Sequence, residues 1–277
     1  MRVVLLTAHT RDGEVQHRYV ASEVVRQFGN ELQAIIVATG RNVPALQKLR
    51  KWVKRYSLAQ LASRLGVRLF GKLTKSGEKR QASFRSVLFP QGEDGKMPGG
   101  DKLTFVTSHN SAECIDLIER ARPDIVLVYG TLIIGKKLIG SVDRIINLHT
   151  GLSPRYRGSD TIFWPIHNGE PDQIGVTVHR LEPGIDSGPI LARGRPQVAG
   201  TDDEATIFAK AVALGAALLC SCARREVDGQ SNPIVQDLSQ GREYRSVEKT
   251  LAAERKATRL LKAGILGEGL EHWQEEY

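Results

Sequence analysis

The chain opens with two mostly apolar runs joined by an amphipathic segment, and this pattern restricts the fold more than any other feature. Residues 2–8 and Leu32–Ala38 have strand length, while His17–Phe28 carries apolar residues at helical spacing. A strand without strict polar alternation is typical of a parallel sheet buried on both faces. The opening therefore predicts a βαβ unit with a right-handed crossover.

The same alternation of strands and helices continues along the chain. Further strands are expected at Leu103–Val106, 124–128, up to Asn147, 174–179 and 189–192, and helices at Ser111–Ala121, 159–168, Ala205–Val227 and about Val247–Ala263. These elements predict an α/β fold with a Rossmann-like, mostly parallel sheet flanked by helices.

Two segments do not fit this alternation. Residues 42–65 predict an amphipathic helix with a cationic face, and the glycine-rich residues 71–101 predict a long surface excursion. We therefore expect one main domain over 1–229, with a basic insertion at 41–101, and a short C-terminal helical extension over 230–277.

Composition indicates a cytoplasmic protein. The three cysteines lack metal-ligand spacing and suit a reducing compartment. The apolar run at the start is too short for a signal peptide, and Ala211–Cys222 falls below the roughly 20 residues of a membrane span. We expect neither a membrane segment nor a metal.

The net charge of +8 is concentrated in one block. Residues 41–85 hold thirteen Lys or Arg and a single acid, Glu78. Such a block is either a solvated helix face or a surface that attracts an anionic partner. Both interpretations stay open from the sequence.

Polar groups suited to acyl transfer follow the strand that ends at Asn147. The stretch 147–158 contains Asn147 and His149, and the stretch 181–190 contains Asp186. They supply the amide, imidazole and carboxylate that can carry an acyl group onto an amine. In an open α/β sheet, ligands bind at such strand ends.

Residues 123–196 resemble the folate-dependent formyltransferases, the family of the methionyl-tRNA, glycinamide ribonucleotide and nucleotide-sugar enzymes. That family carries an Asn-x-His pair, a Ser-Leu-Leu-Pro turn, a Gly and a later Asp. The corresponding residues here are Asn147, His149, Pro154, Gly158 and Asp186, and Trp164–Glu170 and Gly175–His179 are similar to the family's intervening segment.

The turn departs from the family pattern. Gly151-Leu152-Ser153-Pro154 stands in place of Ser-Leu-Leu-Pro. A glycine at 151 removes a hydroxyl and is expected to free the turn. Whether Gly151 and Ser153 alter activity is left open.

The resemblance implies that Asn147, His149 and Asp186 are catalytic and that N10-formyltetrahydrofolate is the donor. The amide and imidazolium N–H groups would stabilise the oxyanion formed when an amine attacks. Asp186, facing His149, would keep that ring protonated and orient the group that gives up the proton. The structural alternative is that Asn147 caps the strand end, His149 is a core histidine and Asp186 is a turn carboxylate.

The resemblance also implies a pterin pocket between two loops. Its expected residues pair apolar side chains with glycine, and they are Tyr129, Gly130, Leu132, Ile133, Leu181, Gly184 and Ile185. A core role for Leu132 and Ile133 is the alternative. Arg155 and Arg157 are expected to bind an anionic group of the acceptor, or else to be solvated.

Three functions are compatible with these residues. The leading one is an N-formyltransferase for a small anionic amine, best matched by an amino sugar carried on a nucleotide. The second acts on aminoacyl-tRNA, which fits the basic block; the resemblance would then predict a separate C-terminal domain, whereas 48 residues follow Gly229. The third is a non-catalytic binding module, and a homodimer through the C-terminal helix is left open.

Overall fold

The protein is described by a computed structural model that covers residues 1–8, 14–40, 66, 76–92 and 95–277. The helix expected at 42–65 and most of the basic block fall outside these residues.

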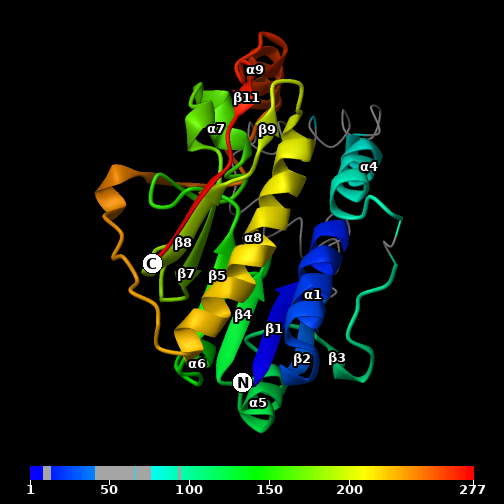
Figure 1. The fold of residues 1–277 in the computed structure, drawn as a ribbon, viewed down its shortest axis with the longest axis vertical. Coiled ribbons are helices and arrows are strands. Elements are labelled where there is room, and N and C mark those ends of the chain that lie inside the picture. Colours follow the sequence, from blue (N-terminus) through cyan, green and yellow to red (C-terminus); the bar gives the residue numbers. More distant parts are fainter. Residues whose placement is uncertain (9–13, 41–65, 67–75, 93–94) are drawn as a thin grey trace.

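An eight-stranded mixed sheet forms the centre of the fold (Figure 1). Five strands run parallel, in the order β3 (Leu103–Val106), β2 (Leu32–Ala38), β1 (Val3–Ala8), β4 (Ile125–Tyr129) and β5 (Ile145–His149). Three antiparallel strands follow: β7 (Val176–Arg180), β8 (Ile190–Arg195) and β12 (Trp273–Glu276). The predicted mostly parallel α/β fold is confirmed.

Helices cover the parallel part of the sheet on both faces. One face, with Val3 and Leu5, packs against α1 (Glu14–Phe28), α4 (Ser76–Leu88) and α8 (Glu204–Val227). The other face, with Val4 and Leu6, packs against α5 (Ala112–Ala121) and α6 (Lys136–Ile139). This two-sided burial explains why the strand sequences are apolar without alternation.

The helix α8, with 24 residues, has the length and composition of a membrane span. In its most apolar stretch, however, 56% of the residues are buried inside the protein. It packs along the central sheet beside α1 (Figure 1). Asp203 caps its N-terminus by accepting a hydrogen bond from the Thr206 N–H at 2.8 Å. We therefore interpret α8 as a core helix.

The structure corrects two expectations about the segments outside the main pattern. Within 71–101, residues Ser76–Leu88 form α4, whose Phe84 and Leu88 are buried, so an excursion without regular structure is wrong there. After Gly229, the expected helix is present as α9 (Leu251–Lys262), but three short strands accompany it: β10 (Arg242–Tyr244), β11 (Gly269–Leu270) and β12. These strands are too short and polar to show a pattern in the sequence.

Shorter elements complete the fold. They are β6 (Tyr156–Gly158), α7 (Phe163–Asn168), β9 (Val198–Ala199) and the 3-10 turns Gly29–Glu31, Gly100–Lys102, Pro171–Gln173 and Leu238–Gln240. β6 pairs with β10, and β9 with β11, outside the main sheet.

The close contact between α8 and β5 predicts the effect of one substitution. A Cβ at Gly215 would overlap the Leu148 side chain, so Gly215→Ala should lower the free energy of unfolding by about 1–2 kcal/mol despite the better helix propensity of alanine. The exposed helical Gly77 has open space around it, and Gly77→Ala should be neutral or slightly stabilising. Urea unfolding of both variants measures the difference, and equal effects would contradict this packing.

Candidate active site

Asn147 and His149 lie on the last residues of β5, on the sheet face opposite α8. Their neighbours Ile146 and Leu148 pack into the core formed with α8, so the alternation of a strand turns the two polar side chains to the other face. The antiparallel strand β7 places His179 opposite Asn147 and Thr177 opposite His149. The sheet register thus gathers two histidines and an amide at one strand end.

The structure brings Asp186 to this group from the loop between β7 and β8. Its carboxylate lies 3.3 Å from His149 Nδ1 and 3.5 Å from His179 Nε2. The Asn147 amide lies 3.1 Å from His179 Nε2. The three side chains that were expected to be catalytic therefore meet in one place, and a fourth, His179, joins them.

Asp186 is held as a carboxylate. Burial alone would raise the pKa of its carboxyl group, but His149, His179 and the Gly158 N–H, which donates to Asp186 at 2.9 Å, hold that pKa well below its usual range. Its φ of +48° lies in the left-handed region, which Asp adopts more readily than most residues.

Both nitrogens of the His149 ring face acceptors of the protein. Nε2 lies 2.8 Å from the Tyr156 carbonyl, and Nδ1 faces Asp186. The ring is 6% exposed. To stabilise a bound oxyanion, a ring N–H of His149 must give up its contact with Tyr156 or with Asp186. The predicted donor role of His149 therefore stays a prediction.

Gly151 has a different role from the one expected. Its φ is not positive, so glycine is not required by the backbone conformation of the turn. A Cβ there would lie 2.6 Å from His149 Nε2 and 2.8 Å from the Tyr156 carbonyl. Glycine at this position therefore provides space for the contact between His149 and Tyr156.

The buried Thr177 fixes the remainder of the turn. Its hydroxyl donates to the Gly151 carbonyl at 2.7 Å and accepts from the Ser153 N–H at 3.0 Å. These two bonds hold the turn over β7.

From the sequence, His179 belongs only to the segment Gly175–His179 that is similar to the family, and no role is predicted for it. Its Nδ1 lies 2.8 Å from the Arg180 carbonyl, and its side chain is 1% exposed. In β7, the apolar Val176 and Val178 alternate with the polar Thr177 and His179. This alternation would place His179 on the same sheet face as Asn147, but only if the pairing of β5 with β7 is known.

The residues expected to hold the pterin differ in their exposure. The Tyr129 side chain is buried in the core on the α1 and α8 face, where its ring lies 5.2 Å from that of His17. Leu132 and Ile133 are 78% and 76% exposed, so the alternative core role is wrong for both.

The remaining pterin residues are glycines and two half-buried apolar residues. Gly130 (φ +63°) and Gly184 (φ +143°) adopt conformations that favour glycine. Leu181 and Ile185 are half-buried, and Leu181 packs beside the α5 core. Glycines beside exposed apolar side chains suit contact with a flat ring, and the donor-binding role stays a prediction.

The two arginines differ in their partners. Arg155 forms a bidentate pair with Glu170, at 2.9 and 2.7 Å, so its guanidinium is already neutralised. Arg157 donates to the carbonyls of Pro154 and Ile185, at 3.3 and 3.4 Å. It therefore lies nearer to the Asp186 loop, and within the part of the chain that the structure describes it forms no ion pair with a carboxylate.

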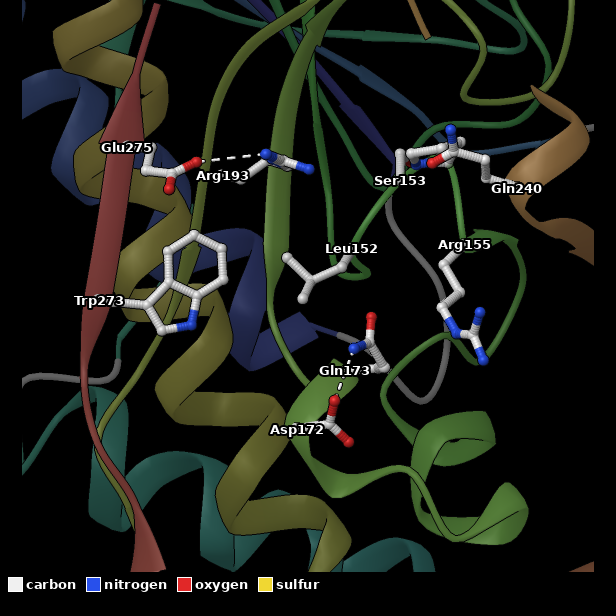
Figure 2. Close-up of a pocket in the computed structure, with 10 residues that line it drawn as sticks. Leu152, Ser153, Arg155, Asp172, Gln173, Arg193, Gln240, Trp273 and Glu275 are labelled. Carbon is white, nitrogen blue, oxygen red and sulfur yellow. Dashed lines mark hydrogen bonds and ion pairs between the residues drawn. The ribbon is translucent and has the colours of Figure 1, made fainter. Parts of the chain in front are cut away.

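A cavity of about 590 Å³ lies on the other side of the turn (Figure 2). Trp273 and Glu275 of β12 and Arg193 of β8 line one wall, and Arg155 and Gln240 line the other. Asn147, His149 and Asp186 do not line it. We therefore place the candidate chemistry at the end of β5 and not in this cavity.

Comparison with known proteins identifies the family. A family model described as formyl transferase matches residues 75–222, more than half of the chain. The chain belongs to the formyl transferase family. Asn147, His149 and Asp186 all lie within the matched segment.

Curated relatives include methionyl-tRNA formyltransferases. That of Streptococcus pyogenes is 32% identical over 130 residues, covering 47% of this chain and 42% of the relative. That of Limosilactobacillus fermentum is 31% identical over 166 residues, covering 57% of this chain and 52% of the relative. The chain thus spans about half the length of the curated relatives it matches.

Solved structures share the fold at low identity. A sugar N-formyltransferase from a Shewanella species has a TM-score of 0.56 at 15% identity, covering 94% of this chain and 88% of that one. A 4-N formyltransferase from Francisella tularensis has a TM-score of 0.54 at 17% identity, covering 88% and 75%. This likeness confirms the formyltransferase fold.

The environment of Asp186 predicts a pH-dependent contribution to stability. Because its pKa is lower in the folded chain, ionised Asp186 stabilises the fold above an unfolded pKa of about 3.9, and this contribution is lost as the pH falls through the folded value. Asp186→Asn, which tolerates the same φ, should lower the free energy of unfolding at about pH 7, with a smaller difference from wild type at about pH 3.

Urea unfolding at several pH values measures this difference. The exposed Asp143→Asn is the control, with an expected effect within about 0.5 kcal/mol. An Asp186→Asn protein as stable as wild type at neutral pH would contradict the electrostatic interpretation.

Proposed function

We propose that this protein is an N-formyltransferase that moves a formyl group from N10-formyltetrahydrofolate to a primary amine. The observation that carries the proposal is the meeting of Asn147, His149 and Asp186 at the end of β5, within the segment that the family model matches. A sugar 3N-formyltransferase of the same fold, with a TM-score of 0.50 at 12% identity, was solved in the presence of dTDP and 5-N-formyl-THF, which supports a folate donor.

The donor supplies the one-carbon unit: the amine adds to the formyl carbon and leaves an oxyanion on the formyl oxygen, and the bond from that carbon to N10 then breaks while one proton moves from the amine to N10. Asn147 and His149 would stabilise the oxyanion through their N–H groups. Asp186, whose pKa is held low, is a weak base. We assign it the tasks of stabilising charge on His149 and orienting the amine or a water.

An amino sugar carried on a nucleotide is the acceptor class that we favour. The sequence Pro154-Arg155-Tyr156-Arg157-Gly158 resembles the sugar and tRNA branches. Arg157 lies beside the Asp186 loop through its bond to the Ile185 carbonyl, where it could meet an anionic group of the acceptor. Arg155, paired with Glu170, is assigned a lesser part in binding.

Formylation of an aminoacyl-tRNA is the second candidate, because the curated relatives are methionyl-tRNA formyltransferases. The basic block at 41–85 suits a nucleic acid. A tRNA partner predicts that log Kd changes steeply with log salt, by about 0.9 per neutralised phosphate on a duplex. A nucleotide sugar makes few phosphate contacts and predicts a shallow slope.

We also propose that the protein works in the cytoplasm. Cys114, Cys220 and Cys222 are free and buried, as thiols are in a reducing compartment.

The proposed function is tested with formyltetrahydrofolate and a panel of amino-sugar nucleotides and aminoacyl-tRNAs. Asn147→Ala should reduce kcat by about a hundredfold to a thousandfold, as expected for loss of an oxyanion donor, and His149→Ala should abolish activity. Asn232→Ala, at an exposed surface position, should leave kcat unchanged. Formyl release is followed by the appearance of tetrahydrofolate.

Two results would contradict the proposal. Absence of folate binding in a thermal-shift assay would remove the donor. A biological role that survives His149→Ala would favour a non-catalytic binding module on the same fold.

A further inference from the structure

The short strand β6 contacts both His149 and Asp186. At its first residue, the Tyr156 carbonyl accepts from His149 Nε2 at 2.8 Å. At its last residue, the Gly158 N–H donates to Asp186 at 2.9 Å. The positions of His149 and Asp186 therefore depend on where these three residues lie.

β6 has its strand partner in the C-terminal part of the chain. It pairs in parallel with β10, with Tyr156 opposite Arg242 and Gly158 opposite Tyr244. The Ser159 N–H donates to the Tyr244 carbonyl at 2.9 Å, just beyond the strand. Two strands of three residues are marginally stable by themselves, so packing must hold the pair.

A stack of three aromatic rings provides this packing. The Tyr244 ring stacks on Tyr156, with centroids 5.2 Å apart, and on Trp164, with centroids 4.9 Å apart. The Asn168 amide donates to both tyrosine hydroxyls, at 3.1 and 2.9 Å. Tyr244 is 7% exposed, and its ring therefore joins β10 to β6 and α7 at once.

Two glycines permit the close approach of the backbones. A Cβ at Gly158 would overlap the Tyr244 carbonyl, and a Cβ at Gly241 would overlap the Pro154 carbonyl. Gly158 also has a φ of +95°, which favours glycine. The contact between β10 and the catalytic turn thus involves backbone as well as side chains.

We propose that Tyr244 is a positioning residue, which acts through β6 to hold His149 and Asp186 in their reactive arrangement. The role in turnover rests on the proposed formyl transfer. Tyr244 lies outside residues 75–222, which the family model matches. A residue from the C-terminal part of the chain therefore supports the candidate site within the matched segment.

The test compares Tyr244→Ala with Tyr244→Phe in the full chain. Removing the ring should lower kcat by about a hundredfold, the cost of a displacement of about 1 Å at a catalytic group, while KM for donor and acceptor changes little. Tyr244→Phe keeps the stack and should retain most of the activity. Phe208→Ala, which breaks a stacked pair with Phe84 elsewhere, controls for lost stability and should keep kcat.

A second readout does not depend on activity. The ring N–H signal of His149, assigned by its absence in His149→Ala, should shift in the NMR spectrum of Tyr244→Ala and stay in place in Phe208→Ala. If Tyr244→Ala does not fold, the exposed Asn168→Ala replaces it, with a smaller loss of kcat and a smaller shift in the same direction.

The outcomes separate the two proposals. Shifted His149 signals in a protein without formyl transfer would support the positioning role and remove the proposed function. Wild-type kcat in Tyr244→Ala, or unchanged His149 signals, would overturn the positioning role.

Discussion

The interaction between Asp186 and His149 is the constraint on which the candidate site depends. The Asp186 and His149 side chains are 16% and 6% exposed, and a carboxylate so far removed from water must be paired and hydrogen-bonded. His179 and the Gly158 N–H supply the remaining partners. Because each partner comes from a different element, the contacts of Asp186 link β5, β7, β6 and the loop that carries Asp186.

Much of the fold could be predicted because it follows from burial. The parallel strands are apolar because helices cover both faces, and the capped starts of α5 and α8 carry Ser111 and Asp203. Asn147 and His149 could be placed at a strand end by the apolar residues before them. The approach of Asp186 to His149 could be expected from the family resemblance, since the two residues are 37 positions apart in the chain and spacing alone does not bring them together.

The remainder could not be predicted because it depends on contacts between distant segments. His179 becomes part of the site through the register of β7 on β5, and no local pattern sets that register. The β10 strand has three residues, two of them charged, and becomes a strand only because β6 offers it a backbone edge. Leu132 and Ile133 have a core-like sequence, yet they are exposed in the loop between β4 and α6.

Gly151, where the turn departs from the family pattern, is packed against the same contact that β6 makes with His149. The absent Cβ would point at His149 Nε2 and the Tyr156 carbonyl, which is the contact that β6 offers to the ring. A serine at this position would need β6 to lie farther from β5. In this chain β6 is instead held close by Tyr244 and by the backbone fit at Gly158 and Gly241. The glycine in the turn and the aromatic stack from the C-terminal part are therefore two parts of one packing arrangement, in which a small residue beneath His149 permits the approach that Tyr244 maintains.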